Sequence, residues 1–166
     1  MQDEKAIKIL ISLCQVLNKH KVRYLVVGGM AVNAHGYYRP TTDHDGNIIE
    51  NPDFDFWFDP RYLNYTKLLD AFGDMGFDVV EFKEEDFPFP KSSFFRFKPQ
   101  GYTLDFLPRI GGGLTFRDCY QRRIVSVIEE TEISIIAIED LIVCKKATGR
   151  KKDLEDIAFL EAKHNQ

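Results

Sequence analysis

Two short strand-like runs carry aspartates at positions that place their side chains on one face of a sheet. The first run is DFDFWFD at residues 53–59, and the second is TLDFL at residues 103–107. Because strand side chains alternate between faces with period two, Asp53 and Asp55 project together, and Phe54, Phe56 and Phe58 project to the opposite face. Asp105 is an isolated acid between apolar neighbours in the second run. Two sheet strands with this pattern predict a cluster of carboxylates.

Such a cluster has the chemistry of a metal site. Side chains two apart on a strand lie about 6.5–7 Å apart, so Asp53 and Asp55 can converge on a hard cation such as Mg²⁺ or Mn²⁺ that prefers oxygen ligands. Asp105 can supply a third ligand. Acidic pairs also occur on strand faces that are exposed to water. Here the pair lies on an unusually hydrophobic strand, which favours a location in a cleft or at a sheet edge. Three clustered carboxylates repel one another unless cations neutralise them.

A Gly-Gly pair stands directly after a short apolar run, ahead of both acidic runs. The run at residues 24–27 reads YLVV and predicts a buried strand that ends at Gly28-Gly29. Glycines at this place let the backbone approach a ligand closely and let the next helix point its N–H groups at a phosphate. The alternative is a plain strand-to-helix turn. Neither a P-loop nor a GxGxxG motif is present.

The apolar periodicity predicts one α+β domain over residues 1–166, with a mixed sheet of about five strands flanked by helices. Expected helices cover residues 3–19, 30–34, 60–72, 116–122, 138–148 and 154–163. Expected strand runs cover residues 24–27, 53–59, 77–82, 94–97, 103–107, 124–128 and 132–137, the last four as two hairpins. Residues 37–52 read as a loop. Gly149 suits the end of one helix, and Asp153 suits the N-cap of the next.

Basic residues gather between the last two expected helices. Lys145, Lys146, Arg150 and Lys152 fall within eight residues of an otherwise acidic chain. Lys145 and Arg150 are therefore candidates for neutralising nucleotide phosphates. The segment can equally face an acidic partner, or be a solvated connection between helices.

Together these parts resemble the nucleotidyltransferase superfamily with a polymerase-beta-like fold. The closer resemblance is to small stand-alone bacterial and archaeal domains of the type associated with toxin–antitoxin or abortive-infection systems. The resemblance rests on Val27-Gly28-Gly29-Met30-Ala31-Val32, His35-Gly36, Arg39, Thr42, Asp53, Asp55, Asp105 and the segment from Glu139 to Asp156. It implies transfer of a nucleoside monophosphate from a nucleoside triphosphate (NTP) to a hydroxyl.

The resemblance also implies roles for individual residues. Asp53, Asp55 and Asp105 would be the catalytic metal ligands. The nucleotide would be bound by Gly28, Gly29, Arg39, Thr42, Lys145 and Arg150.

One departure from the family pattern leaves two registers open. In the family the Asp-x-Asp pair closely follows Arg-x-Thr, and here Asp43-His44-Asp45 occupies that spacing. We expect Asp53 and Asp55 to be the metal-binding pair, because the aromatic residues around them favour a strand. The residues His44-Asp45-Gly46-Asn47 instead favour a turn. An inserted segment at residues 43–52 reconciles the two patterns and can cover the nucleotide entrance.

Composition narrows the remaining choices. The net charge of −4 argues against dominant non-specific nucleic-acid binding. Three widely spaced cysteines without a CxxC pair favour a reducing cytoplasm, and neither a signal-peptide pattern nor a membrane-length apolar run is present. The acceptor, and any partner chain that supplies its surface, are not specified. A binding module with a degraded site (an antitoxin or adaptor) and a metal-dependent phosphohydrolase remain alternatives.

Overall fold

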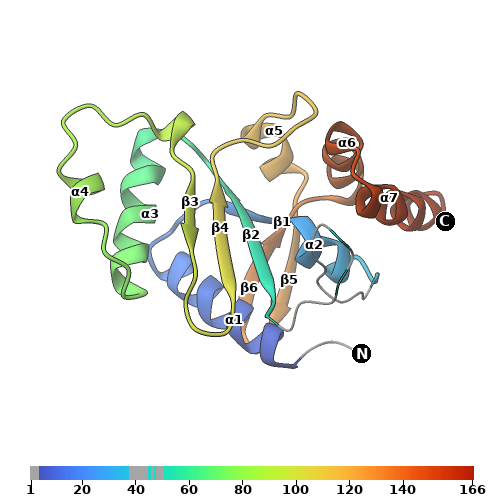
Figure 1. Ribbon diagram of the computed structural model, residues 1–166, viewed down its shortest axis with the longest axis horizontal. Helices are drawn as coiled ribbons and strands as arrows, with labels where there is room; N and C mark the ends of the chain where they lie inside the picture. Colours follow the sequence, from blue (N-terminus) through green and yellow to red (C-terminus); the bar gives the residue numbers. More distant parts are fainter. Residues whose placement is uncertain (1–3, 38–44, 46, 48–50) are drawn as a thin grey trace.

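The computed structural model describes the chain except residues 1–3, 38–44, 46 and 48–50 (Figure 1). Its helices are α1 (Glu4–Lys19), α2 (Gly28–Ala34), α3 (Tyr62–Asp74), α4 (Val80–Lys83), α5 (Phe116–Gln121), α6 (Ile138–Thr148) and α7 (Lys151–His164), with a 3₁₀ turn at Pro90–Ser92. Its strands are β1 (Tyr24–Val27), β2 (Asp53–Phe58), β3 (Phe95–Phe97), β4 (Thr103–Leu107), β5 (Ile124–Ile128) and β6 (Thr131–Ile135).

The strands form one mixed six-stranded sheet in the order β3-β4-β2-β1-β6-β5. The pairs β1–β2, β3–β4 and β5–β6 are antiparallel, whereas β2–β4 and β1–β6 are parallel. The α+β class and both predicted hairpins are confirmed. The sheet has six strands where about five were expected, and of the seven predicted strand runs all but residues 77–82 form strands of it.

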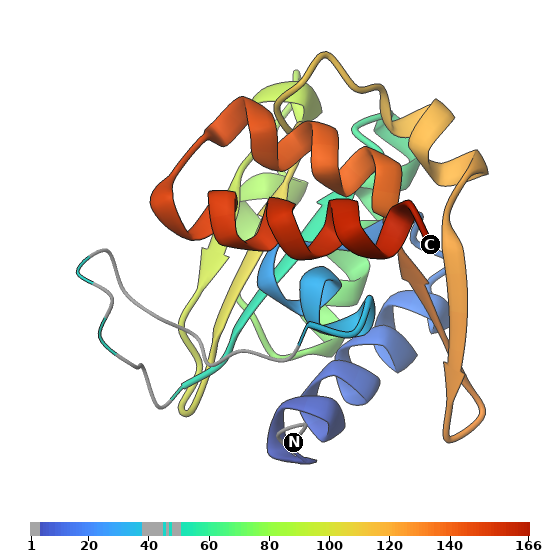
Figure 2. The ribbon, with the colours of Figure 1, turned by 90° about the vertical axis from the view of Figure 1, so that its right-hand side faces the viewer.

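Aromatic side chains hold one face of the sheet against its helices. The ring of Phe72 on α3 lies 4.8–5.0 Å from the rings of Phe95, Phe97 and Phe106 on β3 and β4. On the other face, Trp57 packs edge-on against Phe116 of α5 at 5.2 Å. Helices α3 and α4 therefore lie on one side of the sheet, and α2, α6 and α7 lie on the other (Figures 1 and 2).

The predicted strand at residues 77–82 is wrong. The chain turns at Met75-Gly76, has no regular structure from Phe77 to Val79, and then forms the single-turn helix α4. The side chain of Asp78 accepts a hydrogen bond from the N–H of Val80 at 3.2 Å, and such a local bond competes with strand pairing. Phe77 stacks on Phe97 at 4.0 Å, so the apolar spacing reflects packing against β3.

The start of the last helix was also misplaced. Helix α7 begins at Lys151, three residues earlier than expected, and its N-cap is Arg150. Asp153 is therefore the third helical residue, where its carboxylate accepts the N–H of Arg150 at 3.1 Å. This reciprocal contact satisfies a free backbone donor as a capping box does. Gly149 ends α6 in the left-handed conformation that was expected, with φ of +61°.

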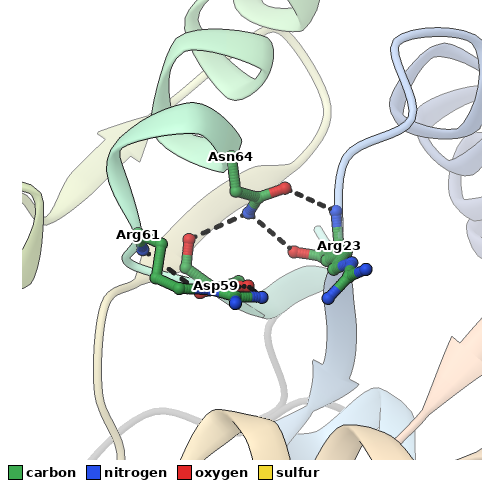
Figure 3. Close-up of polar contacts among 4 residues, drawn as sticks. All are labelled: Arg23, Asp59, Arg61 and Asn64. Atoms are coloured by element: carbon green, nitrogen blue, oxygen red, sulfur yellow. Dashed lines mark hydrogen bonds and ion pairs between the residues drawn. The ribbon is translucent and has the colours of Figure 1, made fainter.

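An amide bridge fixes β1 against β2 at the end of the sheet remote from Asp53 (Figure 3). The side chain of Asn64 accepts the N–H of Arg23 at 2.7 Å and donates to the carbonyl oxygens of Arg23 and Asp59 at 3.1 and 2.9 Å. The buried carboxylate of Asp59 is held in turn by the guanidinium of Arg61, with Nη2–Oδ2 at 2.6 Å. These bonds pin the β1–β2 register, on which the position of Asp55 depends.

Within the described part of the chain, none of the helices combines the length and apolar character that crossing a membrane requires.

Candidate functional site

The two acidic runs become neighbouring strands, and this brings their aspartates together. Strands β2 and β4 pair in parallel, with Asp55 directly opposite Asp105 and Asp53 opposite Thr103. Adjacent strands lie about 4.8 Å apart, so the carboxylates of Asp55 and Asp105 share one patch of the sheet. On its other side, Asp55 pairs with Val27, the last residue of β1.

Gly28 contacts the acidic patch directly. It follows β1 with φ of +65° and begins α2. A Cβ atom built on Gly28 would lie 2.3 Å from Oδ2 of Asp55, closer than real side-chain contacts allow. Glycine is therefore required here both by the backbone angle and by the approach of the carboxylate. The predicted link between the Gly-Gly turn and the acidic strand has a direct geometric basis.

Burial and neighbouring charge raise the pKa of Asp55. The carboxyl group is largely removed from water, and this raises its pKa; the negative charges of Asp105 and Asp53 raise it further, to about 7. The positive charges of Lys145 and Lys152 act in the opposite direction. A carboxylate with such a pKa is typical of a site that is built for a cation or for proton transfer.

Arg96 joins the site and was missed in the sequence analysis. It lies on β3 opposite Asp105, and its guanidinium binds that carboxylate in a two-bond fork, with Nε–Oδ1 at 2.8 Å and Nη2–Oδ2 at 3.0 Å. The side chain of Asp105 is 14% exposed and that of Arg96 is 54% exposed. Counting residues back across the predicted hairpin from Asp105 would have placed Arg96 beside it.

Two of the basic residues at the α6–α7 junction that act electrostatically on Asp55, Lys145 and Arg150, are bound to acids. Lys145 is buried, and its Nζ lies 3.2 Å from Asp153 Oδ1 and 2.9 Å from Asp156 Oδ2. Arg150 donates from Nε to Asp153 Oδ2 at 2.9 Å. The hydrogen bond to Asp153 raises the pKa of Arg150, and the negative charge of Asp55 adds to this effect, so Arg150 lies within electrostatic reach of Asp55. This network joins α6 to α7 and turns positive charge toward β2.

Some predicted site residues lie outside the described part of the chain. Arg39, Thr42 and Asp43 are among these. Asp45 is described and is an exposed turn residue, in agreement with the turn expected around it. Asp53 and Asp55 belong to a regular strand. Which of the two acidic pairs binds a metal stays a prediction.

The donor set suits a hard divalent cation. The carboxylate oxygens of Asp53, Asp55 and Asp105 are the ligands that Mg²⁺ and Mn²⁺ prefer, and a bound dication would offset the repulsion that raises the Asp55 pKa. Among the described residues, no three His, Cys, Asp or Glu side chains converge as a metal cluster. The bidentate contact of Asp105 with Arg96 engages the carboxylate of the predicted third ligand.

Sequence comparisons identify no relatives of this chain. A scan against models of protein families finds no match, and a search of curated proteins finds none either.

Solved structures reveal a shared fold. The lincosamide antibiotic adenylyltransferase LnuA, in its lincomycin-bound crystal structure, matches with a TM-score of 0.58 at 19% identity, over 96% of both chains. A putative nucleotidyltransferase from Thermotoga maritima matches with a TM-score of 0.59 at 15% identity, over 95% of this chain and 93% of that one. The chain therefore has the fold of nucleotidyltransferases.

Proposed function

We propose that this chain is a metal-dependent nucleotidyltransferase that moves a nucleoside monophosphate from an NTP to a hydroxyl acceptor on a protein, an RNA or a small molecule. The observation that carries the proposal is the pairing of Asp55 with Asp105 on adjacent strands, with Gly28 at the start of α2 against Asp55 and Asp53 on the same strand face as Asp55. A sheet with the nucleotidyltransferase fold supports the same reading.

In this proposal Asp53 and Asp55 hold the cation, with Asp105 as a further ligand or as the base. When bound, Mg²⁺ or Mn²⁺ would neutralise the triphosphate and lower the pKa of the acceptor hydroxyl. The acceptor oxygen forms a bond to the α-phosphorus, the bond from that phosphorus to the bridging oxygen of the β-phosphate breaks, and pyrophosphate leaves. The hydroxyl proton passes to a site carboxylate, for which Asp105 is the candidate.

The chain's other residues would bind and orient the NTP. Backbone N–H groups at Gly28 and Gly29 lie beside the acids and would contact phosphate. Lys145 and Arg150 supply positive charge from the α6–α7 junction, although each is also bound to Asp153. Arg39 and Thr42 complete the proposed nucleotide site on the family pattern alone. A toxin–antitoxin context and a cytoplasmic location belong to the same proposal.

A binding module without turnover is the second candidate, and Arg96 favours it. The guanidinium already neutralises Asp105 in a bidentate pair, as a cation would. If this pair persists when nucleotide binds, the third acid is lost to catalysis. Exchange of Arg96 for a neutral residue, Arg96→Gln, would then create or increase turnover.

The test is product analysis with purified protein, labelled NTPs, Mg²⁺ and a lysate of the host as the source of acceptor. Transfer predicts pyrophosphate release and label on an acceptor. A phosphohydrolase would release inorganic phosphate, and a binding module would release neither while still retaining nucleotide. Asp53→Asn and Asp55→Asn should abolish transfer, whereas Asp70→Asn, an exposed acid on α3 across the sheet, should leave it unchanged.

A further inference from the structure

Strand β5 is an edge of the sheet. Among the residues that the structure describes, it pairs with β6 alone, and Figure 2 shows it as the outermost strand at its end of the sheet. Its apolar residues are poorly covered, with Val125 43% exposed and Val127 64% exposed. Exposed apolar edge strands are templates for pairing with another chain, and monomeric proteins usually protect them with charge, proline or bulges.

The hairpin turn fixes which backbone groups of β5 are free. Glu129 and Glu130 have φ of +49° and +64°, as a two-residue type I′ turn requires. The flanking pair, Ile128 and Thr131, is then a hydrogen-bonded pair, and bonding alternates along the strand. Residues 124, 126 and 128 therefore bond to β6. The N–H and C=O groups of Val125 and Val127 point away from the sheet.

The sequence of this edge is self-complementary about Ser126. Residues 122–130 read RRIVSVIEE, with the same apolar order in both directions and opposite charges at the two ends. In an antiparallel pair of such strands with Ser126 opposite Ser126, Val125 lies opposite Val127. Arg123, just before the strand, then comes next to Glu129, the first turn residue after the strand of the other copy. Opposite charges facing each other across strands stabilise the pair.

We propose that a second copy of this chain pairs its β5 with this one across a two-fold axis at Ser126, so that one sheet runs through both copies. In this register the two outward-facing residues, Val125 and Val127, exchange backbone hydrogen bonds with their counterparts. A shift of two residues either way keeps the bonding pattern but places Arg123 or Glu129 opposite a valine. Charge and backbone geometry therefore select the same register. Because each copy uses the same edge, the interface is complete with two copies, as two-fold symmetry requires.

Contacts with Tyr120 fix the position of Arg123 at the basic end of the strand. The guanidinium of Arg123 stacks on the ring of Tyr120 at 3.8 Å, and Arg23 approaches the same ring at 5.8 Å. Arg122 is bound to Asp140, with Nη2–Oδ1 at 2.9 Å, so Arg123 is the arginine placed to meet the acidic turn of the second copy. Glu129 and Glu130 are both exposed at that turn.

Sedimentation velocity over a range of protein concentrations tests the proposal. The 19.3 kDa chain should sediment as a dimer at high concentration and dissociate on dilution. Arg123→Glu and Glu129→Arg should each weaken the dimer at least tenfold, because each places like charges opposite each other. The double exchange should restore it, and Glu81→Arg on α4, away from this edge, should have no effect.

Cysteine cross-linking tests the register. Ser126 would lie opposite its own counterpart as a non-hydrogen-bonded pair, with Cα atoms about 4.5 Å apart, within the range that a disulfide spans. Ser126→Cys should therefore form a covalent dimer under mild oxidation, and Val127→Cys, two residues out of register with its own copy, should not. The wild type gives the background from its own cysteines.

Two results would overturn the inference. One is a monomer at every concentration, and the other is a dimer that both single charge reversals leave intact. Neither result bears on nucleotidyl transfer, since β5 contributes none of the proposed catalytic residues.

Discussion

The carboxylate of Asp55 fills the space that a side chain on Gly28 would need. A Cβ on Gly28 would lie 2.3 Å from Oδ2 of Asp55 and 3.1 Å from its Cγ. The Gly-Gly turn and the acidic strand, which are separate motifs in the sequence, are therefore one structural unit. A side chain added at Gly28 would have to displace the carboxylate of Asp55.

Gly28→Ala should impair both folding and the site. The substitution adds a methyl group against Asp55 and demands a left-handed backbone from a residue that disfavours it. The free energy of unfolding should fall by about 1–2 kcal/mol from the backbone strain alone, with more from the clash. Metal-dependent nucleotide binding should be lost. Chemical denaturation and calorimetric titration measure the two effects.

Gly73→Ala is the matched control, because a Cβ there meets no atom within 4 Å and the residue is helical. It should leave stability unchanged or raise it by up to about 1 kcal/mol. Equal losses in the two variants would contradict the account of Gly28.

The stability of the metal-free protein should fall as the pH rises from about 4 to about 7. The folded state raises the pKa of Asp55 from 3.8 to about 7, so the folded state binds this proton more tightly than the unfolded state does. The protonated carboxyl is favoured in the fold, and its contribution is present at low pH and lost as the pH passes through the folded pKa. The full displacement corresponds to roughly 4 kcal/mol.

Denaturation curves at several pH values, recorded with a chelator, test this. Asp55→Asn should remove most of the decline between pH 4 and 7 and should be more stable than the wild type at pH 8. An unchanged slope in this variant would show that other groups cause the decline.

Metal binding should depend on the strand acids and not on the turn acids. Asp53→Asn combined with Asp55→Asn removes two proposed oxygen ligands from one strand face and should abolish Mn²⁺ and Mg²⁺ binding without loss of the fold. Asp45→Ala, at an exposed turn, should bind metal as the wild type does. Manganese relaxation or calorimetric titration gives the affinities. Loss of binding in Asp45→Ala alone would reverse the choice of register.

Lys145→Met should destabilise the α6–α7 pair strongly. Lys145 is buried between Asp153 and Asp156, whose side chains are fully buried, and its removal leaves their charges poorly compensated. Removing one partner of a buried ionic group costs about 3–5 kcal/mol. Lys146→Met, which breaks a solvent-exposed pair with Glu161, should cost at most about 1 kcal/mol. Thermal unfolding of the two variants measures their losses of stability. Similar losses would mean that burial of the Lys145 ion pairs is unimportant for stability.

Arg150→Ala should weaken NTP binding by about 1–3 kcal/mol if Arg150 neutralises phosphate, the usual range for a charge-assisted contact. The loss should shrink for a nucleoside without phosphates. Arg150 also binds Asp153 at the start of α7, so melting temperatures must accompany the titrations. Arg109→Ala, an exposed arginine outside the proposed site, is the control. Equal NTP affinities in wild type and Arg150→Ala would remove this residue from the site.

Strand pairs were predictable where a segment shows both alternation of apolar and polar residues and turn-forming residues beside it. The alternation in residues 103–107 and 124–128, with turns beside them, fixed two hairpins, and the aromatic run fixed β2. The stretch from Phe77 to Phe82 misled because its apolar residues fit a strand and a bent turn of helix equally well. The local bond from Val80 to Asp78 decided between them.

The site was predictable in its acids and glycines but not in its cross-strand partners. Asp53 and Asp55 follow from period two on one strand, whereas the pairing of Asp55 with Asp105 needs β2 and β4 to lie parallel. That parallel contact joins segments separated by α3, α4 and β3, and no local pattern specifies it. Lys145 was assigned to phosphate because its acidic partners, Asp153 and Asp156, lie eight and eleven residues further along the chain, on a different helix.

The order in which such a site can form follows from these parallel pairs. The two hairpins β3–β4 and β5–β6 close short loops, but β2–β4 and β1–β6 close long ones (Figure 1). Closing long loops costs entropy and slows folding. The carboxylates of Asp55 and Asp105 therefore meet late, and a chain emerging from the ribosome can bring them together only after β4 has been synthesised. On the proposed function, metal affinity would then report that the parallel β2–β4 contact has formed.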